Sequence, residues 1–217
     1  MPRILGANLS ATRLLVAGAV APVLFVGTFL VLGVTRAGYD PSRHFVSQLS
    51  TGDGGWIQIA NFIVSGALLA LGAIGLRRSG GDLVVPALIA AVGVGMILAG
   101  VFVADAGGGY PPGNFGPLEP TVHGRIHEVV SLVVFLALGA AACVTAWSSR
   151  ASPVWSAYSL VSGVTSVGFF AATIVLSMRD DGSVGLLQRV SIIAGFAWLT
   201  TVFLRARRIT EPTLASG

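Results

Sequence analysis

Six long apolar stretches account for most of this chain, and nearly every charged residue lies between them rather than inside them. Each stretch is close to the ~20 residues that an α-helix needs to cross ~30 Å of hydrocarbon. A backbone inside lipid finds no water to bond, so such a segment must satisfy its own amides and is helical. The sequence therefore predicts an all-α fold, an integral membrane bundle of six transmembrane helices at residues 14–34, 57–76, 83–104, 129–147, 155–177 and 184–204.

The composition excludes several other classes of protein. Charged residues make up 10% of the 217 residues, whereas soluble domains carry roughly 25%. We therefore treat residues 1–217 as a single membrane domain, with no soluble part that would bind nucleic acid. No ionisable residue lies at the middle of a stretch, which disfavours a proton-coupled carrier or an ion pump. The one cysteine, Cys143, excludes a disulfide framework.

The arginines predict the orientation. Because the number of helices is even, both termini lie on the same side of the membrane. Of the 13 arginines, eight fall on that side and five on the other. Under the positive-inside rule, this bias places both termini in the cytoplasm and the chain in the inner (plasma) membrane of the cell.

Two connections on the opposite, outer side are much longer than the rest, at residues 35–56 and 105–128. Long ordered loops on a compact scaffold usually carry function. The links at residues 77–82 and 148–153 are short and can only join neighbouring antiparallel helices. We therefore expect the two outer loops to build an outward-facing polar pocket.

The first outer loop contains a helix-start signal. Asp40 precedes Pro41, and an aspartate before a proline is a favourable helix start. The sequence predicts a short helix from Pro41 to about Ser50 that lies on the bilayer surface, with Phe45 and Leu49 toward the lipid. The alternative is that this segment is a plain interfacial anchor.

All three histidines of the chain fall on the outer side. Two of them are four residues apart and share a helical face, in an extension of the fourth helix. Three imidazoles with a carboxylate suit zinc, and the candidate ligands are His44, Asp105, His123 and His127. The alternative is that these side chains hydrogen-bond the loops to the helix ends.

A metal at this position would supply hydrolytic chemistry. Zinc lowers the pKa of a bound water toward neutrality, and that water could cleave an ester or amide of a lipid headgroup. Ser47 and Asp40 lie in the first outer loop and are the candidate catalytic residues.

Arginines on the outer side have two possible roles. Paired with acids they would form a structural network, and unpaired they would suit a lipid phosphate. The candidate headgroup-binding residues are Arg43, Arg125 and Arg189. Arg189 lies within the sixth apolar stretch, so we expect it to face the bundle, with Asp180 or a loop acid as its partner.

The fifth apolar stretch is rich in small residues, including Gly163 and Gly168. Small side chains let helices approach closely inside a membrane. The pattern predicts tight helix packing here, and small-residue faces also offer a route to a homo- or hetero-oligomer.

Two blocks of the chain share motifs with a known family. The first block is YDPSRHFVSQLS at residues 39–50, followed by GGW at 54–56 and NF at 61–62. The second contains AD at 104–105, GYPPG at 109–113 and HGRIH at 123–127. Over about residues 14–204, the chain resembles the DUF998 family, bacterial six-span membrane proteins of unknown function. The resemblance implies a six-helix membrane protein whose two blocks form one site, and it implies no activity.

Three functions stay open. The favoured one is a non-enzymatic membrane protein that binds a lipid or a small amphiphile in the outer pocket. The second is a zinc-dependent hydrolase of lipid headgroups, for which a looser likeness to membrane hydrolases with Ser, Asp and an HxxxH pair is an analogy only. The third is a subunit of a larger membrane complex.

Overall fold

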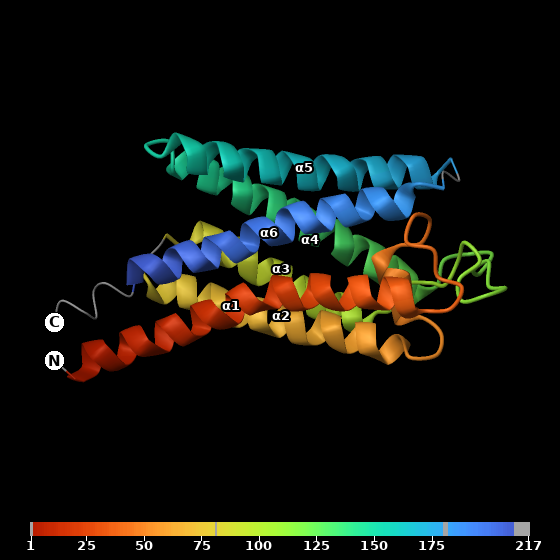
Figure 1. The fold of residues 1–217 in the computed structure, drawn as a ribbon, viewed down its shortest axis with the longest axis horizontal. Helices are drawn as coiled ribbons and strands as arrows, with labels where there is room; N and C mark the ends of the chain where they lie inside the picture. Colours follow the sequence, from red (N-terminus) through yellow and green to blue (C-terminus); the bar gives the residue numbers. More distant parts are fainter. Residues whose placement is uncertain (1, 81, 180–181, 211–217) are drawn as a thin grey trace.

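The computed structural model describes residues 2–80, 82–179 and 182–210. The described residues form six long α-helices (Figure 1), which confirms the predicted fold class. All six are long and apolar enough to cross a membrane. The elements are α1 (Pro2–Thr35), the 3₁₀ helix η1 (Val46–Ser50), α2 (Gly55–Arg78), α3 (Val84–Val101), α4 (Val122–Ser148), α5 (Pro153–Ser177) and α6 (Val184–Thr210).

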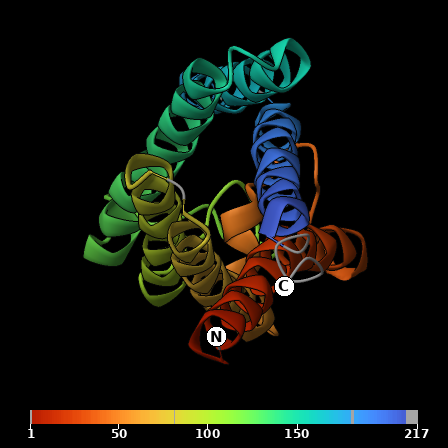
Figure 2. The ribbon, with the colours of Figure 1, turned by 90° about the vertical axis from the view of Figure 1, so that its left-hand side faces the viewer.

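The six α-helices form a ring in chain order. Each helix packs against the next one, and α6 returns to pack against α1. Figure 2 shows this ring from the end at which α1 begins and α6 ends. Short links force neighbouring helices to run antiparallel. As a result, residues 36–54 and 102–121 lie together at the opposite end, which we call the long-loop end (Figure 1).

Aromatic side chains fill the inside of the ring. The Phe25 ring lies 5.0 Å from that of Phe62 and 5.1 Å from that of Phe196. Trp198 and Phe203 of α6 are fully buried. Valines such as Val23 are exposed on the outer surface. Because lipid is as apolar as these valines, the exposed surface suits a membrane, and packing inside the ring holds the helices together.

Glycines make the closest helix contacts. A side chain at Gly66 of α2 would meet the Gly93 carbonyl of α3 at 2.5 Å. Gly163 of α5 packs on Ala142 of α4 in the same way, as the small-residue pattern predicts. Gly168 has nothing within 4 Å of the place where a side chain would start. The expectation of close packing is therefore wrong at Gly168.

The first long loop differs from the predicted surface helix. Residues 41–43 form a turn, and only residues 46–50 are helical, as a 3₁₀ helix. Val46 and Leu49 are fully buried instead of facing lipid, and η1 packs against α1, α2 and α6. The segment therefore inserts into the ring at the long-loop end.

Local hydrogen bonds explain this difference. The Asp40 carboxylate accepts hydrogen bonds from the backbone and the hydroxyl of Ser42, which closes a turn rather than starting a helix. Inside the ring, the side chain of Gln48 caps the Phe45 amide. The side chain of Gln188, from α6, caps the Val46 amide. With these partners the segment can be buried without leaving its backbone groups unsatisfied.

Candidate functional site

The Arg189 side chain holds the first long loop against α6. It is buried, and Nη1 donates to the carbonyl oxygens of Pro41 at 2.7 Å and His44 at 3.0 Å. Nη1 also donates to the carbonyl oxygen of Gly185, one helical turn earlier, at 2.9 Å. Nη2 donates to the Tyr39 hydroxyl at 2.5 Å. The guanidinium thus donates hydrogen bonds to carbonyl oxygens in a bend of the chain, where helix or sheet hydrogen bonds are not available.

Arg189 faces the bundle, as predicted, but its partners are not those expected. Asp180, the expected partner, lies outside the described residues. The partners found among the described residues are three carbonyl oxygens and a phenol rather than a carboxylate. Sequence patterns do not show where backbone carbonyls converge, so this arrangement could not be read from them.

The Tyr39 side chain bonds the same part of the first long loop. Its hydroxyl lies 3.1 Å from the His44 carbonyl and 3.0 Å from the Phe45 carbonyl. Burial raises the pKa of Tyr39 to about 12, although the nearby Arg189 charge opposes this rise. The phenol is therefore a neutral hydrogen-bond donor at any physiological pH.

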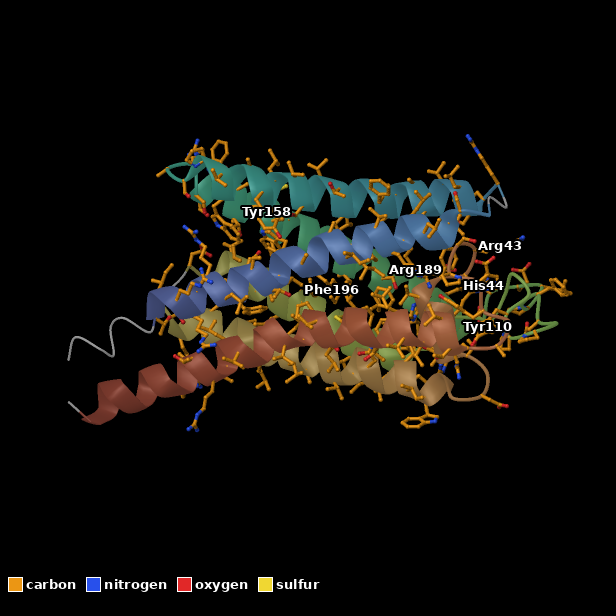
Figure 3. All side chains as sticks on the ribbon, in the orientation of Figure 1. Arg43, His44, Tyr110, Tyr158, Arg189 and Phe196 are labelled. Carbon is orange, nitrogen blue, oxygen red and sulfur yellow. The ribbon has the colours of Figure 1, made fainter. Side chains whose placement is uncertain are left out.

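His44 joins the two long loops. Its Nδ1 accepts a hydrogen bond from the Asp40 amide at 2.8 Å, so Nε2 carries the proton and donates to the Gly108 carbonyl at 3.0 Å. Gln48 donates to the Gly107 carbonyl at 2.9 Å. Figure 3 shows His44, Tyr110 and Arg189 at the long-loop end. Both sequence blocks therefore meet at one end of the ring.

Asp105 fixes the start of α4. Its carboxylate accepts from the Thr121 amide at 2.9 Å and from the Thr121 hydroxyl at 2.6 Å. That hydroxyl in turn caps α4 by accepting from the Gly124 amide at 3.0 Å. A side chain at Gly124 would collide with the carboxylate of Asp105. The HGRIH motif therefore needs its glycine to accommodate Asp105.

His127 is buried and held in one tautomer. Its Nδ1 lies 3.0 Å from the Ala99 carbonyl oxygen and 2.8 Å from that of Phe102. Both partners are acceptors, so Nδ1 carries the proton and Nε2 keeps its lone pair. His123, one turn earlier, is exposed, and its ring lies edge-on to Phe102 at 5.4 Å.

The structure does not assemble the predicted zinc site from His44, Asp105, His123 and His127. In the described residues, no group of three His, Cys, Asp or Glu side chains lies close enough to hold a metal ion. The ring nitrogens of His44 and both oxygens of Asp105 are already bound within the protein. His44, Asp105 and His127 instead hydrogen-bond the loops and helix ends, which was the alternative, whereas the contact described for His123 is with the Phe102 ring.

A cavity of about 480 Å³ opens at the long-loop end, between η1, α4, α5 and α6. One part of its wall is polar and includes Ser47, Gln48, Asp105, His127, Glu128 and Gln188. Another part is apolar and includes Val129, Leu132, Phe170, Ile174 and Met178. Pockets that hold small molecules typically measure ~300–1,000 Å³ and combine apolar walls with a few polar groups. This cavity has both features.

A smaller cavity of about 50 Å³ lies deeper, among the aromatic side chains of the ring. Four residues line both cavities: Ser47, His127, Ser131 and Gln188. The polar groups therefore stand at the border between the open cavity and the apolar interior.

Of the four predicted site residues that remain, three lie away from the cavity and one lies on it. Asp40 is exposed, and the hydroxyl of Ser42 is the main reason that its pKa is lowered. Ser47 lines both cavities. Neither Asp40 nor any candidate headgroup arginine is among the lining residues. Arg43 is exposed, and Arg125 pairs with Glu119 at 3.7 Å on the surface.

Sequence reasoning missed Ser131 and Gln188 as cavity residues. Ser131 lies four residues after His127, so helical spacing alone places both on one face of α4. Gln188 interrupts the apolar run of α6 directly before Arg189. Both signals are present in the sequence, but each is common in membrane helices that bind nothing.

Comparison with known proteins gives one match. A family model described as a protein of unknown function (DUF998) matches residues 19–205. No curated protein and no solved structure matches the chain.

Proposed function

The chain belongs to the DUF998 family of proteins of unknown function, and we propose that this multi-pass membrane protein binds a lipid or a small amphiphile in the cavity at its long-loop end. The observation that carries the proposal is the mixed polar and apolar lining of the cavity. Polar groups such as His127 lie next to apolar ones such as Phe170 and Ile174. A molecule with a polar head and an apolar chain complements both parts at once.

The surroundings of the cavity support this proposal. The cavity lies beside α4 and α5, whose outer faces carry exposed apolar residues such as Leu132 and Ile174. Both residues also line the cavity, so the apolar wall continues into the membrane-facing surface. An amphiphile could therefore keep its chain in contact with lipid while its head enters the cavity.

The uneven distribution of arginines supports a further part of the proposal, which is the orientation of the protein in the membrane. With eight of the 13 arginines on the side of the termini, we propose that the long-loop end faces outward from the inner membrane. The ligand would then be taken from the outer leaflet or from the space beyond it.

Native mass spectrometry of the purified protein tests binding directly. We expect the wild-type protein to retain a lipid or an amphiphile. The variant Ser131→Phe should lose it, because the phenylalanine ring would occupy the space beside His127. Ala140→Phe is the matched control, since Ala140 lies on the exposed face of the same helix. Retention should fall at least about tenfold in the first variant, which corresponds to ~1.4 kcal/mol, and stay unchanged in the second.

Two results would count against binding in this cavity. One is a wild-type protein that retains no amphiphile when it is supplied with total membrane lipid. The other is equal retention by the two phenylalanine variants.

A further inference from the structure

We infer that the ligand of this cavity carries an uncharged hydroxyl headgroup, which donates a hydrogen bond to Nε2 of His127. The inference rests on the proposed function and names the chemical class of the ligand. It follows from three observations: the tautomer of His127, the remaining hydrogen-bonding groups of the cavity, and the signs of the charges that line it.

The tautomer of His127 leaves an acceptor on the cavity side. Nδ1 donates toward the carbonyl oxygens of Ala99 and Phe102, at 3.0 and 2.8 Å. No hydrogen bond to Nε2 occurs among the described residues, and the ring lines both cavities. Nε2 is not among the fully buried atoms of the described residues that lack a partner, so this acceptor is open to the cavity. A ligand hydroxyl in the cavity can therefore donate to it.

The neighbouring groups can bond the same headgroup. The side-chain oxygen of Gln188 accepts from the Val46 amide at 2.7 Å, which leaves its NH₂ group as a donor. The hydroxyls of Ser47 and Ser131 form no hydrogen bond with the described part of the chain, and they can donate or accept. An alcohol hydroxyl donates once and accepts twice, so it matches an acceptor beside several donors.

The charges on the wall disfavour an anionic headgroup. Asp105 and Glu128 both line the larger cavity, and no arginine is among its lining residues. Arg189 is buried behind the first long loop, with its donors used on Tyr39 and on backbone carbonyls. A phosphate would meet like charge and the lone pair of His127. An ammonium could donate to Nε2 but could not accept from Gln188.

Binding of three probes with the same oleyl or oleoyl chain tests the inference: 1-monooleoylglycerol, oleyl phosphate and oleylamine. Apparent affinities are measured by native mass spectrometry in one detergent. We expect 1-monooleoylglycerol to bind at least about tenfold more tightly than the other two. Preference of the wild-type protein for oleyl phosphate or oleylamine would overturn the inference.

Two asparagine variants separate binding from stability. In His127→Asn, the side-chain amide can still donate to the Ala99 and Phe102 carbonyls, but the acceptor at the Nε2 position is gone. We expect about a tenfold loss of 1-monooleoylglycerol affinity at an unchanged unfolding midpoint. His123→Asn, on the exposed face one turn earlier, should leave both quantities unchanged. Equal affinity in the two variants would overturn the inference.

The outcomes distinguish this inference from the proposed function. If none of the three probes binds the wild-type protein, the proposed function fails and the inference fails with it. If the probes bind and are displaced by Ser131→Phe, but the charged ones bind best, only the hydroxyl inference fails.

Discussion

A guanidinium inside an apolar helix is tolerated only when each of its polar groups has a partner. Both terminal nitrogens of Arg189 have partners, and the oxygens come from two segments that are far apart in the sequence, the loop around Pro41 and its own helix at Gly185. The residue therefore acts as a clamp between α6 and the first long loop. Its value lies in the carbonyl groups that it satisfies, since these are buried with it.

The first prediction concerns this clamp. Arg189→Met fills a similar volume but leaves the Pro41 carbonyl without its donor, and leaves the His44 carbonyl with the Tyr39 hydroxyl alone. We expect the free energy of unfolding in micelles to fall by about 3 kcal/mol, as measured by denaturant titration. Arg125→Met, at an exposed pair, should leave it unchanged. Equal effects of the two substitutions would show that Arg189 is not a clamp.

The second prediction concerns the phenol beside the clamp. Burial is the main reason that the pKa of Tyr39 rises from 10.0 to about 12. The unfolded chain therefore releases this proton first, so it binds fewer protons than the folded chain above pH 10. The contribution of Tyr39 to stability should be complete below pH 10 and should be lost between pH 10 and about 12.

Unfolding free energies measured across this pH range check the effect. The chain contains no lysine, so few other groups titrate in the same range. Tyr39→Phe removes the titrating group and should flatten the curve. If the unfolding free energies of wild type and variant changed with pH in parallel, Tyr39 would not be the group that titrates.

At the scale of elements, small residues decide how closely helices approach. Gly163 of α5 lies against Ala142 of α4, whereas Gly168 on the same helix faces open space. Both positions carry glycine in a sequence rich in small residues, and the pattern alone could not distinguish them. The difference depends on which face of α5 meets a neighbour.

The third prediction uses this pair. A methyl group at Gly163 would lie 2.8 Å from the Ala142 side chain, so Gly163→Ala should push α5 from α4. We expect a loss of about 1–3 kcal/mol in the free energy of unfolding. Gly168→Ala meets nothing within 4 Å and should be neutral or gain up to about 1 kcal/mol from helix propensity. A reversed order of stability in the same denaturant titration would contradict this packing.

At the scale of the whole molecule, the ring brings both long loops to one end. His44 bonds to Gly108 across this end, and Gln48 bonds to Gly107. These contacts join the two sequence blocks, at residues 39–50 and 104–127, into one surface at the long-loop end. The contact of Gln48 with Gly107 also favours burial of η1, because this polar side chain of η1 has its partner at the long-loop end.

The fourth prediction concerns orientation. Cys143→Ala removes the one cysteine, and single cysteines can then be placed at Leu118 in a long loop or at Ala151 in the α4–α5 link. We expect a membrane-impermeant maleimide to label Leu118→Cys in intact cells, because the positive-inside rule places the long-loop end outside. Ala151→Cys should be labelled only after lysis. The opposite labelling pattern would reverse the proposed orientation.

The sequence alone was sufficient for the six spans and for the position of both long loops at one end. Each span is a local property, because an apolar stretch must be helical in lipid. Successive spans cross the membrane in opposite directions, so the first and third links lie at the same end. The site was only partly predictable. Ser47, Asp105 and His127 do line one cavity, but the predicted zinc ligands, which included Asp105 and His127, do not form a group of three in the described residues.

The tertiary structure decided what could not follow from spacing. Which oxygens Arg189 meets and which nitrogen of His127 carries a proton both depend on backbone carbonyls from other segments. The burial of Val46 depends in turn on Gln188 of α6, whose side chain bonds the Val46 amide. A sequence pattern shows the types of side chain and their spacing. Every residue contributes the same carbonyl group, so the position of the carbonyl groups leaves no pattern in the sequence. Where those groups converge is a property of the folded chain alone.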